Sequence, residues 1–129
     1  MESITVNKKD YQLNFGIRFS SKLSEKYYLD QEMGDTGRKM KFGIGIQLAV
    51  PYLEMASPDA VFNVIKCGLA KHKIQPTDDD LEEAIEELAI DKGGFDVIAE
   101  ELIETLKATG FYNKAFSEMD QATENQATE

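Results

Sequence analysis

The first 15 residues alternate between apolar and polar side chains, with the period of two that a half-buried β-strand requires. Pairing Val6 with Tyr11 across a turn of residues 7–10 places every apolar side chain of the segment on one face. The same register pairs Ile4 with Leu13. A two-stranded hairpin is only marginally stable by itself, so we expect this face to pack against helices. The apolar residues of the face are Ile4, Val6, Tyr11, Leu13 and Phe15.

Most of the remaining chain has the three-to-four-residue apolar spacing of amphipathic helices. Ser57 and Thr77 are suited to cap helices, and Gly93 marks a helix end. Residues 30–38 are rich in turn-forming residues and predict a surface loop. Helices are expected at about 16–29, 40–56, 58–71, 77–92 and 95–110, with a short one near 112–119.

The run at residues 40–50 fits two patterns. Every second residue from Met40 to Leu48 is apolar, as in a strand, whereas Phe42, Ile46 and Val50 recur at helical spacing. The length of the apolar run favours a helix, and we predict one here.

Together these patterns predict a mostly α fold with an N-terminal β-hairpin (α+β), in which five to six helices form one compact domain. A chain of 129 residues suits a single domain. We expect the domain to cover residues 1–118, with the hairpin at about 3–15. Residues 119–129 are expected to form a disordered tail, because no large apolar side chain follows Met119.

Charge is distributed unevenly along the chain, whose net charge is −10. Residues 1–75 contain 11 Lys and Arg against 8 Asp and Glu, whereas residues 76–129 contain 3 against 16. This negative excess repels phosphate and argues against nucleic-acid binding by counterion release. It suits a basic partner surface, or the basic half of a neighbouring copy in a homo-oligomer. A solvated acidic helix face is the simpler interpretation.

No residue pattern predicts catalysis, a metal site or a cofactor. Three aspartates at 78–80 could begin a calcium loop, but Glu83 stands where such a loop needs Gly and Ala89 where it needs Glu. A helix cap explains these aspartates better. One His72 and one Cys67 are too few for a zinc site, and their spacing separates them on a helix.

The glycines at 43 and 45 lack the third Gly and the Lys of a phosphate loop, so we attribute them to close helix packing. Cys67 lies in an apolar setting that is typical of a core thiol. No apolar run reaches the ~18 residues of a membrane-spanning helix, and Met1-Glu2-Ser3 does not resemble a signal peptide. These features predict a cytoplasmic protein.

Several aromatic residues exceed the evident needs of a small core, namely Tyr27, Tyr28, Phe111, Tyr112 and Phe116. Core packing and partner binding both explain them. Glu86 and Glu87 lie on the polar face of the helix expected at 77–92. The candidate partner-binding residues are therefore Tyr112, Phe116, Glu86 and Glu87.

Two segments carry a family resemblance. The resemblance covers most of the chain and is densest in residues 4–19 and 39–53. Residues 3–16 read S-I-T-V-N-K-K-D-Y-Q-L-N-F-G, close to a family hairpin of the order x-I-x-x-N-G-K-x-Y-x-L-x-F-G, and residues 40–45 read M-K-F-G-I-G. In these segments the chain resembles the tail assembly chaperones of long-tailed phages and prophages, of the siphovirus type. One departure is Lys8, where the family often has Gly, and we expect it to change the type of turn.

The resemblance implies a protein that coats the phage tape-measure protein, keeps it soluble and recruits tail-tube subunits. It also implies a non-enzymatic protein of the host cytoplasm that needs no cofactor or nucleotide and is absent from the mature virion. The alternative is an acidic DNA-mimic decoy that inhibits a nucleic-acid-binding protein. Clustered carboxylates at residues 78–104 motivate it, and the slightly basic first half of the chain argues against it.

Overall fold

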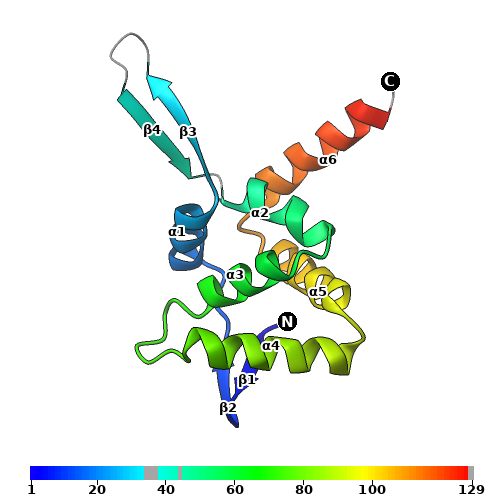
Figure 1. The fold of residues 1–129 in the computed structure, drawn as a ribbon. Helices are drawn as coiled ribbons and strands as arrows, with labels where there is room; N and C mark the ends of the chain where they lie inside the picture. Colours follow the sequence, from blue (N-terminus) through cyan, green and yellow to red (C-terminus); the bar gives the residue numbers. More distant parts are fainter. Residues whose placement is uncertain (34–37, 44, 128–129) are drawn as a thin grey trace.

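The computed structural model describes the backbone of residues 1–33, 38–43 and 45–127, and the side chains of residues 1–28 and 45–120. Within these residues it contains six helices and two antiparallel hairpins (Figure 1), which confirms a mostly α fold with an N-terminal hairpin. The elements are β1 (Ser3–Val6), β2 (Lys9–Gln12), α1 (Ile17–Lys26), β3 (Tyr28–Met33), β4 (Arg38–Gly43), α2 (Gly45–Glu54), α3 (Pro58–Gly68), α4 (Asp78–Lys92), α5 (Phe95–Ala108) and α6 (Asn113–Ala127).

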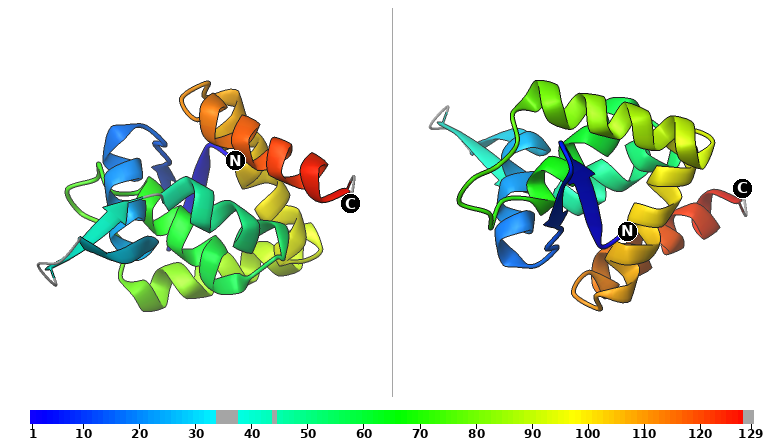
Figure 2. Two further views of the ribbon diagram at one scale, coloured as in Figure 1. Left: turned by 90° about the horizontal axis from the view of Figure 1, so that it is seen from above. Right: turned by 90° about the horizontal axis from the view of Figure 1, so that it is seen from below.

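Helix α1 packs against α2, α3 and β4, and α3 in turn contacts α4 and α5. The acidic helix α4 also covers β1. The β3–β4 hairpin projects from the helices at one end of the molecule, and the N-terminal hairpin lies at the other end beside α4 (Figures 1 and 2). The α5–α6 turn returns the chain to the start of α1, so residues from both ends of the sequence lie together.

The N-terminal hairpin has the predicted face but not the predicted register. Val6 pairs with Lys9 and not with Tyr11, because the turn contains only two residues. These are Asn7 and Lys8, whose φ angles of 51° and 65° are those of a type I′ turn. A shift of two residues keeps the same side chains on the same face. The face is accordingly confirmed: Ile4, Val6, Tyr11 and Phe15 are buried, and Leu13 is half-buried.

A second antiparallel hairpin, formed by β3 and β4, follows α1. The surface loop predicted at residues 30–38 is therefore wrong at both of its ends, because β3 extends to Met33 and β4 begins at Arg38. The rest of that loop, residues 34–37, lies outside the described residues. Helix α1 ends at Lys26, earlier than predicted, because the chain enters this hairpin.

The run at residues 40–50 contains both kinds of secondary structure. Strand β4 ends at Gly43 and α2 begins at Gly45, so the helix predicted over 40–56 is wrong for its first residues and right from Gly45 onward. A Cβ at Gly45 would lie 3.0 Å from the backbone nitrogen of Ser24 in α1. Close helix packing is thus confirmed as the role of this glycine.

The caps predicted for the later helices are present. The hydroxyl of Ser57 accepts a hydrogen bond from the N–H of Ala60 at 3.4 Å. The hydroxyl of Thr77 accepts one from the N–H of Asp80 at 3.2 Å. Helix α4 ends at Gly93, whose φ of 103° favours glycine. The three aspartates in the first turn of α4 therefore stabilise a helix N-terminus, as predicted.

Helix α6 crosses the predicted boundary between domain and tail. Phe116 is buried, and Met119 is half-buried against the core. The boundary expected after residue 118 thus falls inside α6. That residues 119–129 form a disordered tail stays a prediction.

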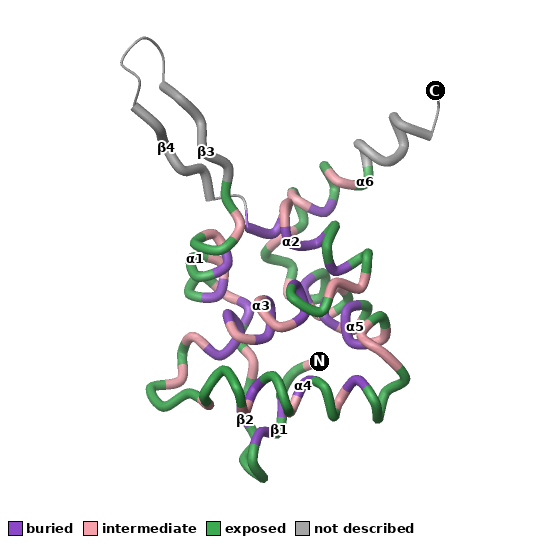
Figure 3. Tube along the Cα trace, in the orientation of Figure 1, coloured by how far each residue is buried: buried purple, intermediate pink, exposed green. Residues whose placement is uncertain are grey.

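One apolar core connects the N-terminal hairpin with α1 to α6, and no polar or charged residue among the described side chains is buried. Figure 3 shows buried positions along the inner sides of α2, α3 and α5. The largest fully buried side chains include Phe19, Leu23, Leu53, Ile65, Leu69, Leu81, Ile98, Leu102 and Leu106.

We predict that Lys8→Gly stabilises the protein. A residue with a Cβ costs roughly 1–2 kcal/mol in the left-handed conformation that Lys8 adopts, and part of this gain is offset by the greater freedom of glycine in the unfolded chain. Urea denaturation should show a free energy of unfolding about 0.5–1 kcal/mol higher. The matched control is Lys9→Gly in β2, which should lower it by about 0.5–1 kcal/mol. A Lys8→Gly variant no more stable than the parent would contradict the assigned turn.

Cys67 provides a second prediction about the core. Its side chain is 2% exposed, and burial raises the pKa of the thiol to about 11. At pH 8 the thiolate fraction should be roughly 100-fold lower than that of an ordinary thiol, because each pKa unit changes it tenfold. We expect an aromatic disulfide reagent to label Cys67 at least that much more slowly in the native protein than in urea. Equal rates would show that the thiol is accessible.

Candidate partner-binding groove

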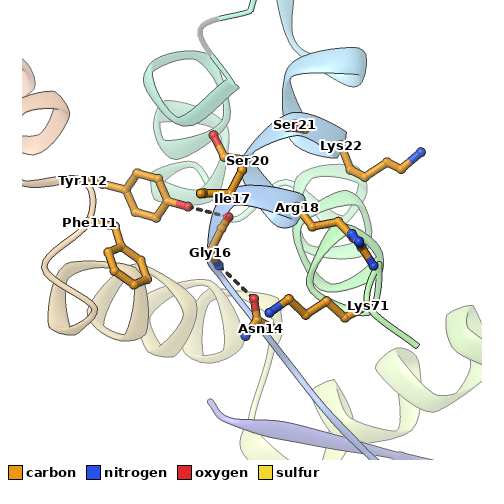
Figure 4. A pocket seen from close by; sticks show the side chains of 10 residues that line it. All are labelled: Asn14, Gly16, Ile17, Arg18, Ser20, Ser21, Lys22, Lys71, Phe111 and Tyr112. Atoms are coloured by element: carbon orange, nitrogen blue, oxygen red, sulfur yellow. Dashed lines mark hydrogen bonds between the residues drawn. The ribbon is translucent and has the colours of Figure 1, made fainter. Parts of the chain in front are cut away.

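An open groove of about 880 Å³ lies where the start of α1 meets the turn between α5 and α6 (Figure 4). We call it the α1 groove. Its main lining residues are Ile17, Arg18, Lys22, Lys71, Phe111 and Tyr112.

Tyr112 joins the two sides of the α1 groove. Its hydroxyl donates to the carbonyl oxygen of Phe15 at 2.5 Å, with the carbonyl oxygen of Gly16 at 3.2 Å. Its ring packs edge-on against Phe19, with 6.3 Å between the ring centroids. Burial raises the pKa of Tyr112 above its ordinary value, so the hydroxyl stays protonated to a higher pH than that of an exposed tyrosine. These contacts fix the α5–α6 turn against the start of α1.

Two large apolar side chains of the α1 groove face solvent. Ile17 is 88% exposed and Phe111 is 69% exposed. Ile17 occupies the first position of α1 and faces outward, whereas Phe19 and Leu23 form the buried face of the helix. Phe111 lies in the turn before α6, next to Tyr112, and its ring meets the Tyr112 ring edge-on at 6.2 Å.

The electrostatics of the α1 groove are opposite to those of the whole chain. Arg18, Lys22 and Lys71 line it, and no carboxylate does so among the described residues. Lys22 has a loose ion pair with Glu25 at 3.7 Å, whereas Arg18 and Lys71 have no salt bridge to any described residue. Helix α1 also lacks a side-chain cap and an acidic residue in its first turn. The positive end of its dipole therefore adds to the three cations.

The four candidate residues from the sequence lie in three different places. Tyr112 lines the α1 groove, although it is half-buried. Phe116 is 8% exposed and belongs to the core, with the ammonium of Lys107 5.4 Å from its ring centre. Glu86 and Glu87 are exposed on α4, outside the groove. Ile17 was not among the residues singled out from the sequence, and Phe111 was noted only as one of the surplus aromatics, beside Tyr112.

A family model described as "Phage tail assembly chaperone protein, TAC" matches residues 3–121. The chain belongs to this family. Searches of curated proteins and of solved structures returned no match. The match confirms the family resemblance seen in the sequence, and the family implies phage tail proteins as partners of the chaperone.

Other sites considered from the sequence of the chaperone have structural explanations. Within the described residues no group of three or more His, Cys, Asp or Glu side chains could hold a metal ion. The ring nitrogen Nε2 of His72 lies 2.7 Å from the carbonyl oxygen of Gln12, and its ring packs edge-on against Tyr11. His72 thus helps to attach the N-terminal hairpin. Among the described helices none is long and apolar enough to cross a membrane.

Alanine substitutions at two phenylalanines should separate the core from the groove surface. Phe116→Ala removes a buried ring and should lower the free energy of unfolding by roughly 3 kcal/mol. Phe111→Ala removes an exposed ring and should change it by less than about 0.5 kcal/mol. Urea denaturation of both variants is the measurement. A loss at Phe111 as large as that at Phe116 would mean that Phe111 is part of the fold.

Proposed function

We propose that this chaperone coats the phage tape-measure protein in the host cytoplasm, keeps it soluble and recruits tail-tube subunits to it, without catalysing a reaction. The observation that carries the proposal is the α1 groove, in which Ile17 and Phe111 expose apolar surface on a member of a tail assembly chaperone family. An apolar groove on a chaperone suits the apolar stripe of a long helical partner.

The small size of the groove suits a transient coat. A cavity of about 880 Å³ accepts a few side chains and not a whole helix, so each contact should be weak. Many copies along one long partner would nevertheless cover its apolar stripe, and a polymerising tube could displace them one by one. Recruitment of tube subunits then requires a second surface on the chaperone.

The acidic exterior supports the same role. Glu86 and Glu87 lie on the exposed side of α4, and the chain carries a net charge of −10. A partner coated with such copies acquires negative charge and resists aggregation. The decoy alternative receives no support from the family, and the cations of the α1 groove interrupt the continuous acidic face that a DNA mimic needs.

Co-expression tests the proposal. The tape-measure protein encoded with this chaperone should be mostly insoluble alone and should become soluble when the chaperone is present. The double variant Ile17→Ser/Phe111→Ser should lose most of this effect, because it removes the apolar surface of the groove. The control is Ile90→Ser, which changes a side chain that is 81% exposed on α4, outside the groove.

Two results would contradict the proposal. One is a tape-measure protein whose soluble fraction does not depend on the chaperone. The other is a pull-down from phage-infected cells in which the chaperone retains a DNA-binding protein and neither tape-measure nor tube protein. Charge reversal of Glu86 and Glu87 should mainly change the salt dependence of capture, because exposed charges tune encounter more than affinity.

A further inference from the structure

We infer that the α1 groove selects an amphipathic partner helix whose apolar stripe is bordered by Asp or Glu. The inference rests on the proposed function, because it names the chemistry of the partner segment that this groove accepts. It runs against the net charge of −10, from which a basic partner would be expected.

The arrangement of the side chains gives the groove two unlike walls. Figure 4 shows Phe111 and Tyr112 on one side and Arg18, Lys22 and Lys71 on the other, with Ile17 near the middle. A bound segment must therefore present apolar atoms to one wall and negative charge to the opposite wall. On a helix, residues three or four positions apart lie side by side, so an apolar residue and a neighbouring carboxylate satisfy both walls at once.

The cations of the cationic wall are available to a partner. Arg18 and Lys71 have no salt bridge to any described residue, and the ion pair of Lys22 with Glu25 is long and exposed. By contrast, Lys66 and Lys92 are paired with Asp78 and Glu101 respectively, at 2.5 and 2.9 Å. Arg18 and Lys71 are thus without a salt bridge to any described residue, unlike Lys66 and Lys92.

The start of α1 adds to this positive potential. Gly16 precedes the helix and supplies no side-chain cap, and the first turn contains Arg18 where α3 and α4 carry aspartates. A carboxylate in the groove would therefore meet three cations and the positive end of a helix dipole.

The surrounding negative charge makes the groove selective. An acidic segment is repelled by the exposed carboxylates of α4 and attracted by the groove cations, so its charge favours the groove over the acidic helix. A segment with apolar residues but basic borders would be repelled by the groove cations, although the rest of the protein attracts it. The groove cations therefore favour an acidic segment, whereas the net charge of the chain favours a basic one, and a binding experiment can distinguish the two.

The test uses the full chain and two synthetic amphipathic helical peptides with the same apolar stripe, one bordered by Glu and the other by Lys. Fluorescence anisotropy with labelled peptides gives the dissociation constants. The Glu-bordered peptide should bind the wild-type chaperone more tightly, and Arg18→Glu/Lys71→Glu should weaken it about tenfold. The matched control is Lys8→Glu/Lys26→Glu, which makes the same change in net charge outside the groove and should weaken it far less.

Tighter binding of the Lys-bordered peptide, or equal loss in the groove and control variants, would overturn the inference, because net charge would then account for binding. Arg18→Gln/Lys71→Gln provides a milder variant if the reversal disturbs folding, and thermal melting checks both. The solubility assay separates the two proposals. If the wild-type chaperone solubilises the tape-measure protein and the Arg18/Lys71 variants do so equally well, only the inference fails. If the wild-type chaperone has no effect on solubility, the proposed function fails.

Discussion

The close approach of α2 to α1 at Gly45 is the constraint on which the arrangement of the helices depends. A Cβ at this position would meet the backbone of α1 at 3.0 Å from Ser24 N and 3.1 Å from Leu23 C, and backbone atoms cannot move aside as a flexible side chain can. The glycine lets α2 begin directly against α1. Its buried residues can then pack inward, and α2 contacts α3, α5 and α6 as a consequence.

The acidic second half of the sequence forms some of its polar contacts with the basic first half. Helix α4, which begins with three aspartates, packs against β1 and α3, and both of these elements belong to the basic half of the chain. Asp78 pairs with Lys66 at 2.5 Å, and Asp80 accepts a hydrogen bond from the side chain of Asn7 at 2.9 Å. Each exposed contact contributes about 1 kcal/mol or less. Arg18 and Lys71 of the α1 groove are among the cations that have no salt bridge to any described residue.

Local signals in the sequence were sufficient for the helices that carry their own caps, such as α3 and α4, and for the buried face of the first hairpin. They were insufficient for β3 and β4, because turn-forming residues dominate residues 30–38 and conceal the strands on either side. The register pairs Asp30 with Lys41 and Glu32 with Lys39, so opposite charges at facing positions were the signal that could have revealed this hairpin. The α1 groove was unpredictable, since it joins residues distant in sequence and depends on Ile17 facing outward.

The hydrogen bond from Tyr112 to Phe15 can form only at a late stage of protein synthesis. The two residues are 97 positions apart, so Phe15 leaves the ribosome long before Tyr112 has been synthesised. Until then the groove lacks the wall that Phe111 and Tyr112 provide. The complete groove can therefore form only after the segment that contains Tyr112 has been synthesised.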